Sequence, residues 1–240
     1  MSPARRGPPP TARWAHTLVA SAVLVLYGNL SALAAAGPWP LPLLPPLGHP
    51  LLAVSALLWA RATGCSWAAL GLGRRGWGRS AALGLGLAAG LAALVGALIA
   101  LFRAVHWTSA TAYPAPASSG AALLLGARLL LLTALCEEVW FRGVLHALWQ
   151  RQLGGVRGIG VVALLFAAWH LGVWAWTLER VTLQPALPRA LTYPAGLLAL
   201  FLAGVLFGGL RAISGHLAGP VVAHWVIDLV LIALVLGGWL

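Results

Sequence analysis

The hydrophobic residues of the chain fall into long runs that are separated by short segments rich in Pro, Gly and Arg. A helix needs roughly 20 apolar residues to cross the hydrocarbon core of a bilayer. Most of the runs reach that length, and the second, which ends at Arg61, is the shortest. The predicted spans cover residues 17–36, 50–63, 81–102, 120–149, 159–176, 193–213 and 217–240. The pattern therefore predicts an all-α fold, a polytopic transmembrane bundle of about seven to eight helices.

The composition supports this membrane location. Of the 240 residues, 61% are hydrophobic and only 8% are charged, whereas a soluble domain carries about 25% charged residues. The mean hydropathy is +0.91. These values exclude a water-soluble globular protein and a disordered chain, so we expect an integral membrane protein that has the lipid bilayer as a partner.

The net charge is +11, and all 15 basic residues that outweigh the four acidic ones are Arg, because the chain contains no Lys. The Arg residues are scattered between the apolar runs and form no single basic face, which argues against a nucleic-acid partner. When the spans alternate across the membrane, most Arg residues of the connecting segments lie on the side of the N-terminus, and only Arg103, Arg180 and Arg189 lie on the other side. Basic loops stay in the cytoplasm, so the N-terminus is predicted to be cytoplasmic.

No long linker or soluble segment divides the chain, and we expect one integral membrane domain and a monomer. Residues 1–114 hold N-terminal transmembrane helices and their loops, and residues 115–240 form the helical core that carries most of the candidate chemistry. Abundant Ala, Gly, Pro and Arg without Lys is typical of a GC-rich bacterial genome. We therefore expect the bacterial inner (plasma) membrane.

The acidic residues carry the most information about function. The chain has four of them, and only Glu179 falls in a predicted loop, whereas Glu137, Glu138 and Asp228 fall inside predicted spans. An ionisable side chain within a bilayer is unfavourable by at least about 2–3 kcal/mol and marks a functional site by default. Acidic residues are thus rare in the chain, and most of them lie within the membrane, where a charged side chain is least favourable.

The first polar cluster is CEEVWFR, residues 136–142. Glu138 and Arg142 are four residues apart on a helix, so they share a face and can form an ion pair. Glu137 points about 100° away from Glu138 and lacks such a local partner. A free carboxylate beside a neutralised one suits a general base or a metal ligand. The alternative is a buried ion-pair clamp between helices.

Two further clusters, FAAWH at 166–170 and HWVID at 224–228, fall in other predicted spans. His224 and Asp228 are four residues apart, so both face the same gap between helices. Counted along their helices, Glu137, His170 and His224 lie at a similar depth, which predicts a joint site. Phe166, Trp140 and Trp169 lie within the motifs and are candidates for lining it. The remaining histidine residues fall near predicted helix ends or in loops, where interfacial positions explain them: His16, His49, His106, His146 and His216.

Two histidines and a free carboxylate in a dry cavity suit the activation of water. In one route Glu137, His170 and His224 bind a divalent metal such as Zn²⁺. In the other, which needs no cofactor, Glu137 and His170 take the proton from a water that attacks an amide. The chain lacks HExxH, the strongest zinc-protease motif, and we favour the route without metal. A non-enzymatic membrane scaffold and a proton-coupled transporter are the alternatives from other functional classes.

The same residues carry a family resemblance. EEVWFR resembles the EExxxR motif of the CPBP family (CAAX prenyl protease and bacteriocin-processing, also called the ABI family), and FAAWH resembles its FxxxH motif. HWVID is similar to its HxxxN motif, with Asp228 in place of Asn. The resemblance extends over about residues 115–235, and the Gly-rich segment 209–224 before His224 is part of it.

The resemblance implies an intramembrane endopeptidase of the eight-helix kind that cuts near the C-terminus of a membrane-tethered protein or peptide. It also implies the roles of the motif residues: Glu137 activates water with His170, His224 and Asp228 form the oxyanion side, and Glu138 with Arg142 supports the site. An ionised Asp cannot donate a hydrogen bond as Asn does, so Asp228 is protonated, orients His224 or binds a cation. A myxosortase-like member that processes C-terminal sorting signals fits the short chain.

Overall fold

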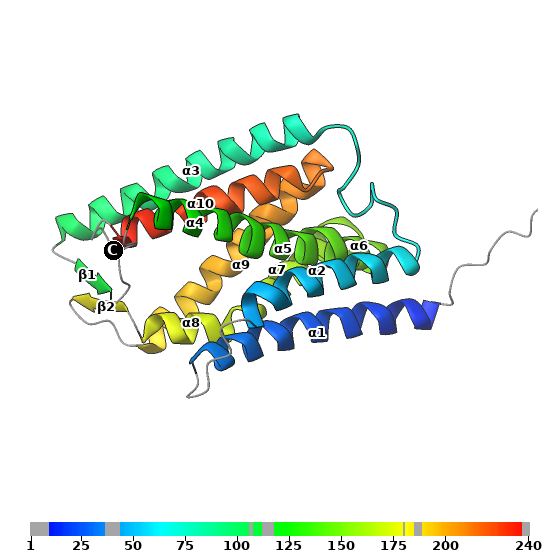
Figure 1. Ribbon diagram of the computed structural model, residues 1–240, viewed down its shortest axis with the longest axis horizontal. Coiled ribbons are helices and arrows are strands. Elements are labelled where there is room, and N and C mark those ends of the chain that lie inside the picture. The colour runs from blue at the N-terminus through cyan, green and yellow to red at the C-terminus, as the bar shows by residue number, and fades with distance from the viewer. Residues whose placement is uncertain are drawn as a thin grey trace, which may run out of the picture.

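A computed structural model describes residues 10–36, 44–105, 108–111, 118–179, 181–184 and 189–236, which form an elongated bundle of helices (Figure 1). The predicted all-α fold is confirmed. The helices are α1 (Pro10–Ala36), α2 (Leu44–Ala62), α3 (Trp77–Ala104), α4 (Ser119–Arg128), α5 (Leu135–Glu138), α6 (His146–Leu153), α7 (Gly155–Trp169), α8 (Leu171–Leu178), α9 (Arg189–Ser214) and α10 (Ala218–Leu236). Two π-helical segments, η1 (Leu129–Ala134) and η2 (Val139–Leu145), join α4, α5 and α6 into one continuous rod.

Each predicted span coincides with one of these rods. Among the described residues, four helices are long and apolar enough to cross a membrane, and the pair α7 and α8, bent by 45° at its break, makes five if it counts as one span. The helix at Ala218–Leu234 is apolar but shorter. Large apolar side chains such as Leu51 and Leu58 of α2 are exposed on the outer surface, as expected for helices that face acyl chains.

Some sequence predictions fall outside the described residues. These are the boundary after residue 114 that separates the two predicted parts of the domain, Arg180, His106 and the last four residues of the final predicted span.

The rod from Ser119 to Leu153 forms the centre of the bundle. Every residue from Cys136 to Trp149 is buried, whereas no residue of α4 is buried. A helix that is buried on all sides must be surrounded by other helices, and α2, α7 and α9 contact this part of the rod. The π-helical turns lie directly before and after the short α5 segment, which contains Glu137 and Glu138. Such turns in long helices frequently occur at functional sites.

Small residues allow the outer helices to approach closely. A Cβ atom added to Gly84 of α3 would overlap the backbone carbonyl of Gly219 in α10, and one added to Gly204 of α9 would lie 2.9 Å from Ala163 of α7. Glycine at helix crossings is typical of membrane proteins, where packing and not hydrophobicity drives association. The pair α3–α10 forms the side of the bundle opposite α1, and the pair α7–α9 lies between them, where α7 contacts α1 (Figure 1).

A short antiparallel ribbon closes one end of the bundle. β1 (Thr108–Thr111) pairs with β2 (Val181–Gln184), and Thr108 lies opposite Gln184. Both strands lie in segments that the sequence predicts as polar loops, and their β-branched residues favour extended backbone. The ribbon joins the loop after α3 to the loop after α8 (Figure 1).

Candidate active site

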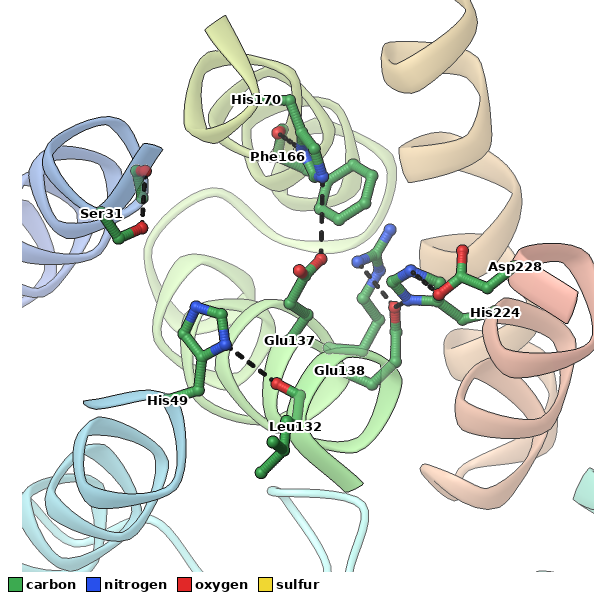
Figure 2. A network of polar contacts seen from close by, with 11 residues as sticks. Ser31, His49, Leu132, Glu137, Glu138, Phe166, His170, His224 and Asp228 are labelled. Atoms are coloured by element: carbon green, nitrogen blue, oxygen red, sulfur yellow. Dashed lines mark hydrogen bonds and ion pairs between the residues drawn. The ribbon is translucent and has the colours of Figure 1, made fainter. Parts of the chain in front are cut away.

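The carboxylate of Glu138 is the centre of a buried polar network. Its Oε1 atom accepts a hydrogen bond from Nη1 of Arg142 at 3.0 Å and one from Nδ1 of His224 at 2.8 Å (Figure 2). The predicted i,i+4 pair of Glu138 and Arg142 is thus present, and both side chains are fully buried. His224 comes from α10, so the network ties the central rod to the last helix. Since a carboxylate can only accept, the Nδ1 atom of His224 carries a proton.

Asp228 lies on the other side of the His224 ring. Its Oδ2 atom is 3.7 Å from Nε2 of His224, one helical turn along α10. The two groups face the same gap, as their spacing predicts. If the ring carries a second proton, the network holds two cationic groups and two carboxylates, which balances its charge within the bilayer.

Arg142 is held by aromatic rings as well as by Glu138. The carbon of its guanidinium group lies 4.3 Å from the ring centre of Phe166, 5.3 Å from that of Phe207 and 5.9 Å from that of Phe141. These rings belong to α7, α9 and η2, so the cation joins three segments through cation–π contacts. Phe166 is buried between Arg142 and the ring of His170, whose centre is 4.6 Å away.

Glu137 faces away from this network and toward His170. Its Oε2 atom is 3.8 Å from Nε2 of His170 (Figure 2). The Nδ1 atom of His170 lies 2.8 Å from the backbone carbonyl oxygen of Phe166. A carbonyl only accepts, so Nδ1 carries a proton, and in the neutral form of the ring Nε2 offers a lone pair to the carboxylate. Two acceptors that face each other across this gap require a proton donor between them.

His170 occupies the break between α7 and α8, and Asn29 of α1 fills that break. An unbroken helix would join the N–H group of Gly172 to the carbonyl oxygen of Ala168. Instead, the Gly172 N–H donates to Oδ1 of Asn29 at 2.8 Å, and Nδ2 of Asn29 donates to the Ala168 oxygen at 2.9 Å. The carboxamide thus satisfies both backbone groups that the bend separates, which is a requirement inside a bilayer.

A cavity of about 290 Å³ opens beside Glu137 and His170. It is lined by residues of α1, α2, the central rod, α7, α8 and the break between them: Gly28, Ser31, Ala32, His49, Thr133, Glu137, Trp169, His170, Val173 and Trp176. The predicted site residues therefore fall into two groups. Glu137, His170 and Trp169 line the cavity, whereas His224 and Asp228 belong to the network around Glu138.

Trp140 and Phe166, which the sequence suggests as lining residues, lie behind the cavity wall. Both are buried, and neither belongs to the cavity lining. The ring of Trp140 packs at 4.7 Å from the ring centre of Trp169 and supports it from behind. Phe166 supports His170 in the same way.

His49 and Asn29 belong to this region although no motif of the sequence points to them. His49 was predicted at an interface, but the structure places it in the cavity wall, and His146 is buried as well. No spacing along the chain relates His49 to Glu137, because helix packing alone brings them together. Asn29 offered a signal, since it is the only Asn of the chain and lies inside the first apolar run.

The arrangement does not favour a metal centre. In the part of the chain that the structure describes, no three His, Cys, Asp or Glu side chains are grouped so that they could hold a metal ion. We therefore derive no chemical step through a metal.

The comparison with protein families agrees with the motifs. The profile of the family described as Type II CAAX prenyl endopeptidase Rce1-like matches residues 119–230, from α4 into α10. No curated protein and no solved structure gives a match. Residues 119–230 are therefore similar to this family, in agreement with the resemblance of the motifs to CPBP proteases. The apolar helices support an integral membrane protein, and the family match supports a protease.

We expect Arg142→Ala to destabilise the fold. The substitution leaves the Glu138 carboxylate buried without its cationic partner, and breaking a buried pair in this way lowers stability by about 3–5 kcal/mol. Folded yield and thermal stability in detergent measure the effect. Arg157→Ala, on an exposed position of α7, serves as the control. A normal abundance of Arg142→Ala would contradict the role of the pair as a clamp.

Asn29→Ala should loosen the break that presents His170. The substitution leaves the Gly172 N–H and the Ala168 carbonyl without their partner, a loss of about 1–3 kcal/mol. Hydrogen exchange at the Gly172 amide should become faster. Ser31→Ala on the same helix removes a hydroxyl that bonds only to its own turn, at Gly28, and should leave that amide protected. Unchanged exchange in Asn29→Ala would show that the carboxamide does not hold the break.

Proposed function

We propose that the chain is an intramembrane endopeptidase in which Glu137 and His170 activate a water molecule for attack on a peptide bond. One observation carries the proposal: Oε2 of Glu137 and Nε2 of His170 lie 3.8 Å apart on the wall of a cavity, and both are acceptors. A water molecule can donate one hydrogen to each of them. Its oxygen lone pairs then remain free to attack a carbonyl carbon.

The reaction follows from these positions. Glu137 takes one proton as the water oxygen bonds to the carbonyl carbon, and the carbonyl oxygen becomes an oxyanion. His170 holds the second hydrogen and keeps the oxygen aimed at the substrate. The carboxyl group of Glu137 then returns its proton to the amide nitrogen, the C–N bond breaks, and a carboxylic acid and an amine leave the site.

We assign His224 to stabilisation of the oxyanion. Because Glu138 accepts the hydrogen bond from Nδ1, only Nε2 remains available to donate toward a substrate oxygen. The carboxylate of Asp228, 3.7 Å from that nitrogen, favours the doubly protonated ring that such a donor requires. In this proposal Asp228 orients His224 and does not itself contact the oxyanion, so an Asp can stand where relatives have Asn.

The proposal extends to the substrate, the cofactor and the location. The substrate is a membrane-anchored protein or peptide that is cut near its C-terminus, as the family resemblance implies. We propose a myxosortase-like role for the protein. Its location is the bacterial inner membrane, with the N-terminus in the cytoplasm. The proposed reaction needs no metal. The cavity is bordered by α1, α2, the central rod, α7 and α8, and a bound peptide that fills it would displace water from the peptide bond.

Glu137→Gln should abolish cleavage, because the amide cannot take a proton from water. The loss of a general base lowers the rate by about 10²–10⁴-fold. The assay uses purified protein in liposomes with a pool of peptides that carry an acyl anchor and differ at their C-termini, and mass spectrometry detects shortened products. Glu179→Gln, at an exposed position beyond α8, should cleave as the wild type does.

The scaffold and the transporter predict a different result in this assay. Either function would leave the peptides intact for the wild-type protein as well. Cleavage that persists in Glu137→Gln would instead assign the role of general base to another group.

Removal of metal should leave the cleavage rate unchanged, because the proposed mechanism moves the proton between water and Glu137 alone. The measurement is the rate on the same peptide pool before and after dialysis against a strong chelator. A loss of activity that Zn²⁺ restores would contradict the metal-free mechanism and favour coordination by Glu137 and the nearby imidazoles.

A further inference from the structure

We propose that His49 is a substrate-binding residue whose Nε2 atom accepts a hydrogen bond from a backbone N–H group of the peptide. The inference rests on the proposed protease function and adds a residue to it. His49 belongs to α2, outside the region that the family profile matches, and no motif of the sequence points to it.

The ring of His49 is held in a fixed orientation at the cavity wall. Its Nδ1 atom lies 3.0 Å from the backbone carbonyl oxygen of Leu132 in η1 (Figure 2). The rings of Tyr27, Trp140 and Trp169 surround it, with centres 5.6, 5.3 and 6.0 Å away. A polar ring held on several sides presents its remaining nitrogen in one defined direction.

The hydrogen bond to Leu132 also fixes the tautomer. A carbonyl only accepts, so Nδ1 carries the proton and Nε2 of the neutral ring is an acceptor. Among the described residues this Nε2 atom is buried without a hydrogen-bond partner. His170 has the same arrangement, with Nδ1 bonded to Phe166 and Nε2 free for the cavity. Two imidazole acceptors from different helices therefore border one cavity.

A peptide backbone supplies the donor that this acceptor lacks. A peptide that enters the cavity leaves water behind, and each buried N–H group then needs a protein acceptor. Glu137 and His170 are engaged by the attacking water in the proposed mechanism. The hydroxyl of Ser31 donates to Gly28 of its own helix and is a second acceptor in the cavity wall. His49 offers a fixed acceptor that neither the proposed reaction nor the fold uses.

The matched substitutions His49→Asn and His49→Gln test the hydrogen-bond roles of the two ring nitrogens separately. The amide of Asn reaches the position of Nδ1 and can keep the bond to Leu132, but it leaves nothing at the position of Nε2. The longer Gln places an acceptor near Nε2. On the peptide of the pool that the wild type cuts fastest, we expect KM of His49→Asn to rise about tenfold with little change in kcat, the effect of one lost hydrogen bond. His49→Gln should recover part of the loss.

His16→Asn is the control for the loss of an imidazole from the bundle. His16 of α1 packs edge-on against Trp59 of α2 and does not line the cavity, so its KM should stay at the wild-type value. Thermal stability in detergent identifies variants that fail to fold. A wild-type KM in a folded His49→Asn protein would overturn the proposal.

Binding without cleavage distinguishes this inference from the protease function. Glu137→Gln protein with ¹⁵N-labelled histidine is titrated with the same peptide pool, and the resonance that disappears in His49→Asn identifies His49. We expect its Nε2 signal to move as the nitrogen accepts a hydrogen bond. A shift without cleavage by the wild type would support His49 and contradict proteolysis. Cleavage without a shift would overturn the His49 proposal alone, and the absence of both would overturn the two together.

Discussion

A carboxylate that is buried in a membrane protein must be paired, and the hydrogen bonds of Glu138 meet that requirement. One oxygen of this side chain binds both Arg142 of its own helix and His224 of α10. The rings of Phe166 and Phe207 hold the same arginine from α7 and α9. The central rod and three other helices are thereby fixed around a single charge. Lipid offers no water that could replace a lost hydrogen-bond partner. Loss of either partner would therefore leave the Glu138 carboxylate incompletely paired.

This pairing gives two adjacent glutamates opposite characters. Glu138 is neutralised by its neighbours. The Oε2 atom of Glu137, in contrast, is buried without a hydrogen-bond partner among the described residues. This atom faces the Nε2 atom of His170. The difference arises from direction alone, because consecutive residues of a helix point about 100° apart. The π-helical turns on both sides of α5 place this pair where the rod is enclosed by other helices. A paired carboxylate and a carboxylate that faces a cavity can therefore be neighbours in sequence without sharing partners.

The sequence predicts those parts of the site that depend on local periodicity. The Glu138–Arg142 pair and the approach of His224 to Asp228 follow from spacings of four residues, and the apolar runs predict where each rod lies. The partner of His224 does not follow, since the choice between Glu137 and Glu138 depends on how α10 rotates against the central rod. The bend at His170 was also not predicted, because FAAWH contains no Pro or Gly and Gly172 just beyond it is one of 29 Gly residues, most of which mark no break. Tertiary contacts from Asn29 and not a local signal stabilise that bend.

The N-terminal helices consequently form part of the site and are not an accessory to a self-sufficient core. Asn29 of α1 satisfies the broken backbone that carries His170, and Gly28 leaves room for Trp169, whose ring a Cβ atom would overlap. His49 of α2 contacts Leu132 one helical turn before Cys136 and Glu137. Glu137 and His170 lie within the region that the family profile matches, whereas four other residues of the cavity lining lie outside it, namely Gly28, Ser31, Ala32 and His49. Changes in α1 and α2 can therefore alter the cavity wall while Glu137 and His170 stay in place. Such changes must keep an acceptor and a donor, which Asn29 supplies here, for the backbone groups at the break between α7 and α8.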